Sequence, residues 1–103
     1  MKMVKTAKQI KDIIKREYPF LKNQFSVKRI GLFGSFSAGT VKESSDVDLV
    51  VEFNTPIGFK FMTLADYLEN KLGRKVDLLT PAGIENIRVK STAQRIKESI
   101  VYV

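Results

Sequence analysis

Three aspartates have the residue type and spacing of a metal site. Asp46 and Asp48 stand two residues apart in "SDVDLVVEF", and Asp77 lies in the later segment "KVDLLT". Aspartate is uncommon in strands because its short side chain competes for backbone hydrogen bonds.

In a strand, Asp46 and Asp48 would point to the same side, about 6.5 to 7 Å apart along the backbone, so their oxygens can converge on one ion. Clustered carboxylates repel one another unless a cation lies among them. The pattern therefore predicts a hard ion, Mg²⁺ or Mn²⁺, which could activate a hydroxyl and clamp a phosphoryl or nucleotidyl group.

A Gly-Ser turn precedes the first two aspartates. Gly34 ends a predicted strand, and the following "SFSAG" could form a short helical turn whose backbone N–H groups face an anion together with the Ser35 hydroxyl. Each feature has an ordinary alternative, because a lone D-x-D is usually a strand end in water and a lone Gly-Ser is usually just a turn. Asp77 by itself could face solvent. The combination of the three features, in this order, favours a functional site.

Six elements are predicted to position these residues. A helix begins at a capping box of Thr6 and Gln9, and Pro19 is expected to end or kink it near Tyr18. The other elements are strands over 26–34, 45–53 and 75–80 and helices over 61–72 and 84–99, in the chain order helix, strand, strand, helix, strand, helix.

Alternation within the strands assigns the aspartates to one kind of face. The second strand places on the core face Val47, Leu49, Val51 and Phe53 and on the open face Asp46, Asp48, Val50 and Glu52. Glu52 is interpreted as an exposed charge. Asp77 falls on the open face of its own strand because Val76 and Leu78 would point to the core. The predicted fold is a single α/β (α+β) domain over 1–103, a small mixed β-sheet with helices packed on its apolar face.

Composition excludes several kinds of chemistry. The chain has no cysteine and no histidine, so it has no disulfide, no zinc site of the usual nitrogen and sulfur ligands, and no Cys-His or Ser-His-Asp catalysis. Catalysis would have to use carboxylates, hydroxyls, lysines or a hard metal ion. No apolar run reaches the roughly 20 residues that cross a bilayer, and the charged N-terminus lacks a signal-peptide pattern. A cytoplasmic protein without a membrane partner is expected.

The net charge of +7 is unevenly distributed. Residues 1–30 hold nine of the 18 basic residues and two acids, whereas residues 31–70 hold two basic residues and six acids. The basic N-terminal region is interpreted first as a solvated helix face. The alternative is attraction to a polyanion, either nucleic acid or the phosphates of a nucleotide.

Four segments together resemble the minimal nucleotidyltransferase family of the DNA polymerase β superfamily. They are "GSFSAG", "SDVDLVVEF", "KVDLLT" and the C-terminal "ESIVYV", and the resemblance covers nearly the whole chain. It implies a polymerase β-like nucleotidyltransferase fold. It also implies Mg²⁺, with two ions expected, bound by Asp46 and Asp48 and completed by Asp77, which helps to activate the acceptor hydroxyl. Gly34 and Ser35 would hold the terminal phosphates of the nucleotide, and Ser45 is counted with them.

The resemblance further implies a partner protein. Many members of the family act as the antitoxin of a HEPN-domain toxin, transferring AMP from ATP to a tyrosine of that toxin. The partner would then supply the substrate domain that a 103-residue chain lacks, in a hetero-oligomer, with a homodimer as a further possibility. Two other functions stay open, namely an antitoxin that neutralises its partner by docking and a basic nucleic-acid-binding module.

One position departs from the family pattern. Members commonly show Gly-Ser-x-Ala-Arg-Gly in the turn, whereas this chain has Ser37 and Ala38 where alanine and arginine would stand. The departure removes a bidentate phosphate ligand that lysine does not replace equally. Lys42, Arg88 and Lys90 are the candidates to compensate.

Overall fold

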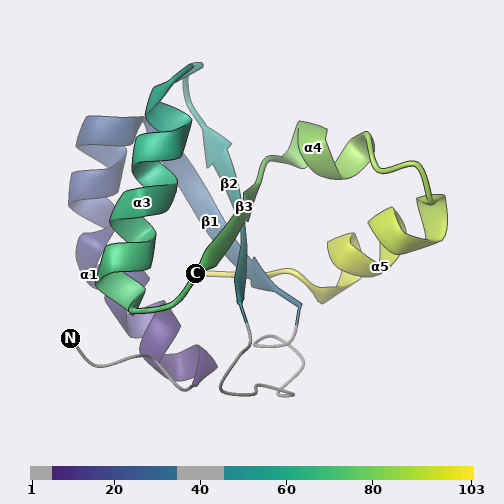
Figure 1. The fold of residues 1–103 in the computed structure, drawn as a ribbon, viewed down its shortest axis with the longest axis horizontal. Coiled ribbons are helices and arrows are strands. Elements are labelled where there is room, and N and C mark those ends of the chain that lie inside the picture. The colour runs from purple at the N-terminus through teal and green to yellow at the C-terminus, as the bar shows by residue number, and fades with distance from the viewer. Residues whose placement is uncertain (1–5, 35–45) are drawn as a thin grey trace.

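The computed structural model describes residues 6–34 and 46–103, which form four strands and four helices (Figure 1). The elements in chain order are α1 (Ala7–Phe25), β1 (Val27–Phe33), β2 (Val47–Phe53), α3 (Lys60–Leu72), β3 (Val76–Leu79), α4 (Pro81–Glu85), α5 (Lys90–Ser99) and β4 (Val101–Tyr102). The sheet has the order β3-β2-β1-β4. β1 is antiparallel to both β2 and β4, and β2 is parallel to β3. The predicted mixed α/β sheet is therefore confirmed.

Helices α1 and α3 cover one face of the sheet and form the main core with it (Figure 1). Both helices are amphipathic, so each turns an apolar stripe toward the strands. The buried side chains of this core come from both helices and from alternate strand positions: Ile10, Ile14, Leu21, Phe25, Val27, Ile30, Leu32, Val47, Leu49, Val51, Leu64, Leu68, Leu72 and Val76.

A second, smaller core lies on the other face of the sheet. Phe33 and Val50 pack there against Ile84 of α4 and Ala93 of α5. Figure 1 shows α4 and α5 as a projection on the side of the sheet away from α1 and α3. Helices therefore lie on both faces of the sheet. Val50 is an apolar residue on the face that the sequence pattern left open, and packing against α4 and α5 removes its side chain from water.

Helix α1 continues past the proline that was expected to end or kink it near Tyr18. The capping box at its start is confirmed, with Thr6 Oγ1 accepting from the Gln9 N–H at 3.1 Å. The helix ends at Phe25, so the prediction of an end near Tyr18 was wrong. Pro19 forfeits one backbone hydrogen bond. Burial of Leu21 and Phe25, worth about 1.5 to 3 kcal/mol each, offsets that loss.

The C-terminal region differs from the single helix predicted over 84–99. It forms two helices, and α4 begins with Pro81 after the Thr80 side chain, which accepts from the Gly83 N–H. β4 was not predicted, and its approach depends on Gly31, where a Cβ atom would lie 2.5 Å from Ile100 Cγ2. No helix in the described residues is long and apolar enough to span a bilayer.

Candidate functional site

The strand register brings two of the three predicted metal ligands together. Asp48 of β2 pairs with Asp77 of β3 in the parallel ladder, so both side chains leave the sheet on the same face. Asp46 precedes β2, next to the point where the Val47 N–H donates to the Lys75 carbonyl oxygen at 2.9 Å. The face is the one opposite α1 and α3, as alternation predicts.

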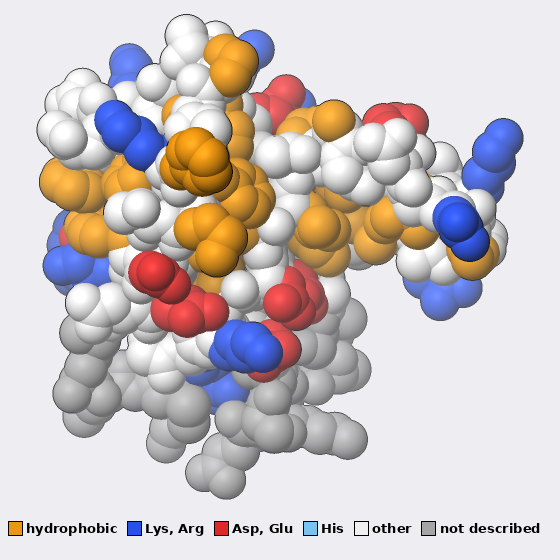
Figure 2. Space-filling view, turned by 45° about the horizontal axis from the view of Figure 1, so that its top comes forward, with side chains coloured by type: hydrophobic (Ala, Val, Ile, Leu, Met, Phe, Trp, Pro, Cys, Tyr) orange, Lys and Arg blue, Asp and Glu red, His pale blue; other side chains and the backbone are white. Residues whose placement is uncertain are grey.

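The electrostatics of Asp48 show that negative charge is crowded at this edge. Burial, followed by repulsion from Asp77 and Asp46 and a hydrogen bond with Asp77, raises the pKa of Asp48 to about 6. The ionised carboxyl group is therefore disfavoured unless a positive charge neutralises it. In Figure 2, Asp and Glu side chains gather on the lower part of the described surface.

The aspartates do not close into a three-ligand cage. Within residues 6–34 and 46–103, no group of three or more Asp, Glu, His or Cys side chains is close enough together to hold a metal ion by itself. The donor set still fits a hard cation, because carboxylate oxygens are the ligands that Mg²⁺ takes and it keeps several waters besides.

Gly34 lies directly against the Asp48 carboxyl group. Its φ is +75°, a left-handed conformation that side-chain-bearing residues rarely adopt, and a Cβ atom there would lie 2.1 Å from Asp48 Oδ2. Only glycine leaves room for this approach. The structure thus places Gly34, the described residue of the predicted phosphate-binding turn, against the strand that carries Asp48. The other predicted phosphate ligands, Ser35 and Ser45, lie outside the described residues, as do Ser37, Ala38 and Lys42.

Two of the residues suggested to replace the missing arginine lie in or next to the segment that joins α4 and α5. Arg88 and Lys90 belong to the connection between α4 and α5 and the start of α5, which Figure 1 shows at the outer end of the projection. Both are exposed.

Two features of this face were missed in the sequence. Phe33 lies opposite Asp48 in the antiparallel ladder and is buried, so it forms the floor beside the carboxyl groups. Glu52, interpreted as a free exposed charge, accepts a hydrogen bond from Arg29 Nε, and the Arg29 guanidinium lies 4.0 Å from the centre of the Tyr102 ring. Opposite charges at facing positions of two strands were the signal that could have identified the pair.

Comparison with known proteins identifies the family to which this chain is similar. The model of the nucleotidyltransferase domain family matches residues 7–103. "Putative protein adenylyltransferase MJ1379" of Methanocaldococcus jannaschii is 42% identical over 103 residues, covering 97% of this chain and 100% of the relative. "Protein adenylyltransferase MntA" of Thermococcus cleftensis is 36% identical over 99 residues, covering 95% of this chain and 96% of the relative.

Solved structures share the fold. A minimal nucleotidyltransferase structure superposes with a TM-score of 0.66 and 23% identity, covering 89% of this chain and 93% of that one. A toxin-antitoxin crystal structure with AMP-PNP superposes with a TM-score of 0.60 and 24% identity, covering 92% of this chain and 69% of that one.

Proposed function

This chain belongs to the nucleotidyltransferase domain family and is a nucleotidyltransferase, and we propose that it transfers AMP from ATP to a tyrosine hydroxyl of a partner toxin. The observation that carries the proposal is the paired carboxyl groups of Asp48 and Asp77 beside Gly34. These are the groups that the transfer of a nucleotidyl group needs side by side, namely metal ligands and a backbone turn for phosphate.

The aspartates have separate roles in the proposal. Asp46 and Asp48 would hold Mg²⁺, with two ions expected and Mn²⁺ as an alternative, and Asp77 would complete the site. When bound, the metal supplies Lewis-acid polarisation of the phosphate oxygens and stabilises the leaving pyrophosphate. Asp77, which is exposed, would accept the proton of the acceptor hydroxyl.

The reaction is an in-line displacement at the α-phosphate of ATP. The acceptor oxygen forms a bond to the α-phosphorus, the bond from that phosphorus to the bridging oxygen breaks, and pyrophosphate leaves. Gly34, Ser35 and Ser45 would hold the phosphates, since the open backbone at Gly34 can approach an anion closely. Most of the rate enhancement would come from positioning and electrostatics.

Relatives support the choice of nucleotide and acceptor class. The Thermococcus cleftensis relative is named a protein adenylyltransferase, which favours AMP as the transferred group and a protein as the acceptor. Two of the structures that share the fold are toxin-antitoxin complexes, which favours a toxin as that protein. We propose a HEPN-family toxin, held in a hetero-oligomer with this chain acting as the antitoxin.

A second candidate function is neutralisation by docking alone. It is favoured by Ala38, which stands where the family commonly has arginine. In that case the partner would bind without being modified.

Intact-mass measurement of the partner separates the two functions. The partner is incubated with this protein, ATP and Mg²⁺, and then its mass is compared with that of an untreated sample. A gain of one or more AMP units supports transfer. A stable complex whose partner keeps its original mass supports docking and contradicts transfer.

A further inference from the structure

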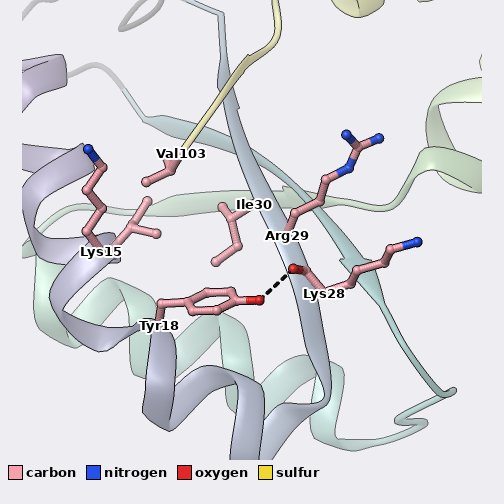
Figure 3. A pocket seen from close by; sticks show the side chains of 7 residues that line it. Lys15, Tyr18, Lys28, Arg29, Ile30 and Val103 are labelled. Atoms are coloured by element: carbon pink, nitrogen blue, oxygen red, sulfur yellow. Dashed lines mark hydrogen bonds between the residues drawn. The ribbon is translucent and has the colours of Figure 1, made fainter.

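A slot between α1 and β1 lies at the edge of the sheet, with its floor on the side away from the aspartates. It has a volume of about 240 Å³. Figure 3 shows its side chains: Ile14, Lys15, Tyr18, Lys28, Arg29, Ile30 and Val103. The slot faces the α1 side because Ile14 and Ile30 belong to the core that α1 and α3 cover. It is therefore separate from the proposed transfer site.

Hydrogen bonds hold the walls of the slot in place. The Tyr18 hydroxyl donates to the Lys28 carbonyl oxygen at 2.7 Å, tying the helix to the strand (Figure 3). The Val103 N–H donates to the Ile30 carbonyl oxygen at 2.9 Å and ties the C-terminal strand to the same edge. A preformed apolar slot takes a ligand group without the cost of ordering its walls.

Lys15 and Lys28 line the slot, and neither forms an ion pair among the described residues. Lys8, Lys11 and Lys15 recur at helical spacing on α1, and Lys28 stands on β1. In the part of the chain that the structure describes, the ion pairs use Arg29, Lys71 and Lys97 and none of these four lysines. In Figure 3 the cationic ends of Lys15 and Lys28 point away from the apolar floor, on opposite sides of the slot.

We propose that this surface binds single-stranded nucleic acid, with one base in the slot and the flanking phosphates on Lys15 and Lys28. The slot has an aromatic wall, Tyr18, and apolar side chains at its floor, which suit the flat face of an unstacked base. A phosphate lies on each side of every base in a strand, which matches cations that project from both sides of the slot. Double-stranded nucleic acid keeps its bases stacked and would leave the slot empty.

The salt dependence of binding tests the phosphate contacts. Fluorescence anisotropy measures the affinity for labelled oligo-U RNA and oligo-dT DNA of about 12 nucleotides at about 50 to 200 mM salt. The double variant Lys15→Gln/Lys28→Gln is compared with Lys60→Gln/Lys90→Gln, which removes the same charge from exposed positions elsewhere. Each lost single-strand phosphate contact lowers the slope of log K against log salt by about 0.7, so the first variant is expected to lose about 1.4 and the control to keep the wild-type slope.

The base contact is tested separately, with an abasic oligonucleotide of the same length. It should bind more weakly than oligo-U or oligo-dT because nothing enters the slot. Three results would each overturn the proposal. The two double variants could lose the same amount of salt slope, the abasic strand could bind as tightly as oligo-U or oligo-dT, or the wild type could bind no oligonucleotide at the lowest salt. Displacement of the oligonucleotide by poly-glutamate of equal charge would overturn it in favour of an acidic protein partner. The outcome does not depend on nucleotidyl transfer, because the slot shares no residue with that site.

Discussion

The Asp48 side chain links the stability of this protein to its proposed function. Its pKa is raised to about 6 by burial and by the nearby Asp77 and Asp46, against an ordinary value of 3.8. The folded state therefore holds a proton at Asp48 over a pH range in which the unfolded state has released it. It follows that the free energy of unfolding decreases as the pH rises from about 4 to about 6, and stays lower above that range.

We predict that Asp48→Asn raises the melting temperature of the metal-free protein at pH 7. Asparagine removes the charge that burial and repulsion disfavour but keeps the shape of the side chain. Thermal denaturation in EDTA between pH 4 and pH 8 measures the effect, and Asp66→Asn on the exposed surface of α3 is the matched control. A variant that is no more stable than Asp66→Asn at pH 7 would show that negative charge is not crowded at this edge.

A second prediction concerns the replacement by alanine of two glycines whose backbone has a left-handed conformation. Gly34→Ala and Gly58→Ala should each cost roughly 1 kcal/mol of stability from backbone strain, because φ is +75° and +55°. At Gly58 no atom lies within 4 Å of the added Cβ, whereas at Gly34 the Asp48 carboxyl group must move. Only Gly34→Ala should therefore abolish nucleotidyl transfer. Chemical denaturation and labelled-AMP transfer are measured on both variants, and retained transfer in Gly34→Ala would contradict the placement of the turn.

The elements explain which parts of the fold could be predicted. β2 was predictable because its alternation is a local feature, and α3 because Gly73 ends a clear apolar period. β4 has two residues, and its pairing with Gly31 and Leu32 is a contact between distant parts of the chain. The split between α4 and α5 likewise depends on how Ile84 and Ala93 reach Val50 and Phe33, which periodicity does not encode.

Helix α1 continues through Pro19, so replacing this proline is expected to change the stability of the protein. Local sequence disfavours helix at this position, and tertiary contacts decide in its favour, including the Phe20 ring stacked 4.8 Å from the Tyr67 ring of α3. Pro19→Ala restores the missing backbone N–H inside the helix. Urea denaturation should show a gain of about 1 to 2 kcal/mol, less than the full proline penalty because alanine also loosens the unfolded chain. A loss of stability would mean that the helix is not continuous there.

At the scale of the whole molecule, the two sides of the sheet have different chemistry. The face with Asp48 and Asp77 gathers acidic groups, while the α1 side carries the lysines of the slot. The sequence indicated this division through its basic first third and acidic middle. What the sequence could not show was the position of Arg88 and Lys90, since the projection that carries them depends on packing between the two C-terminal helices and the sheet.

Transfer of labelled AMP from ATP to the proposed partner toxin is measured for wild type, Asp48→Asn and Asp66→Asn, because this reaction depends directly on the carboxyl groups at the sheet edge. All three proteins are first shown to be folded by circular dichroism. We expect wild type and Asp66→Asn to label the partner and Asp48→Asn to lower the rate at least about 100-fold, the scale lost when a group that stabilises the transition state is removed. Full labelling by Asp48→Asn would contradict the assignment of the transfer site to this edge of the sheet.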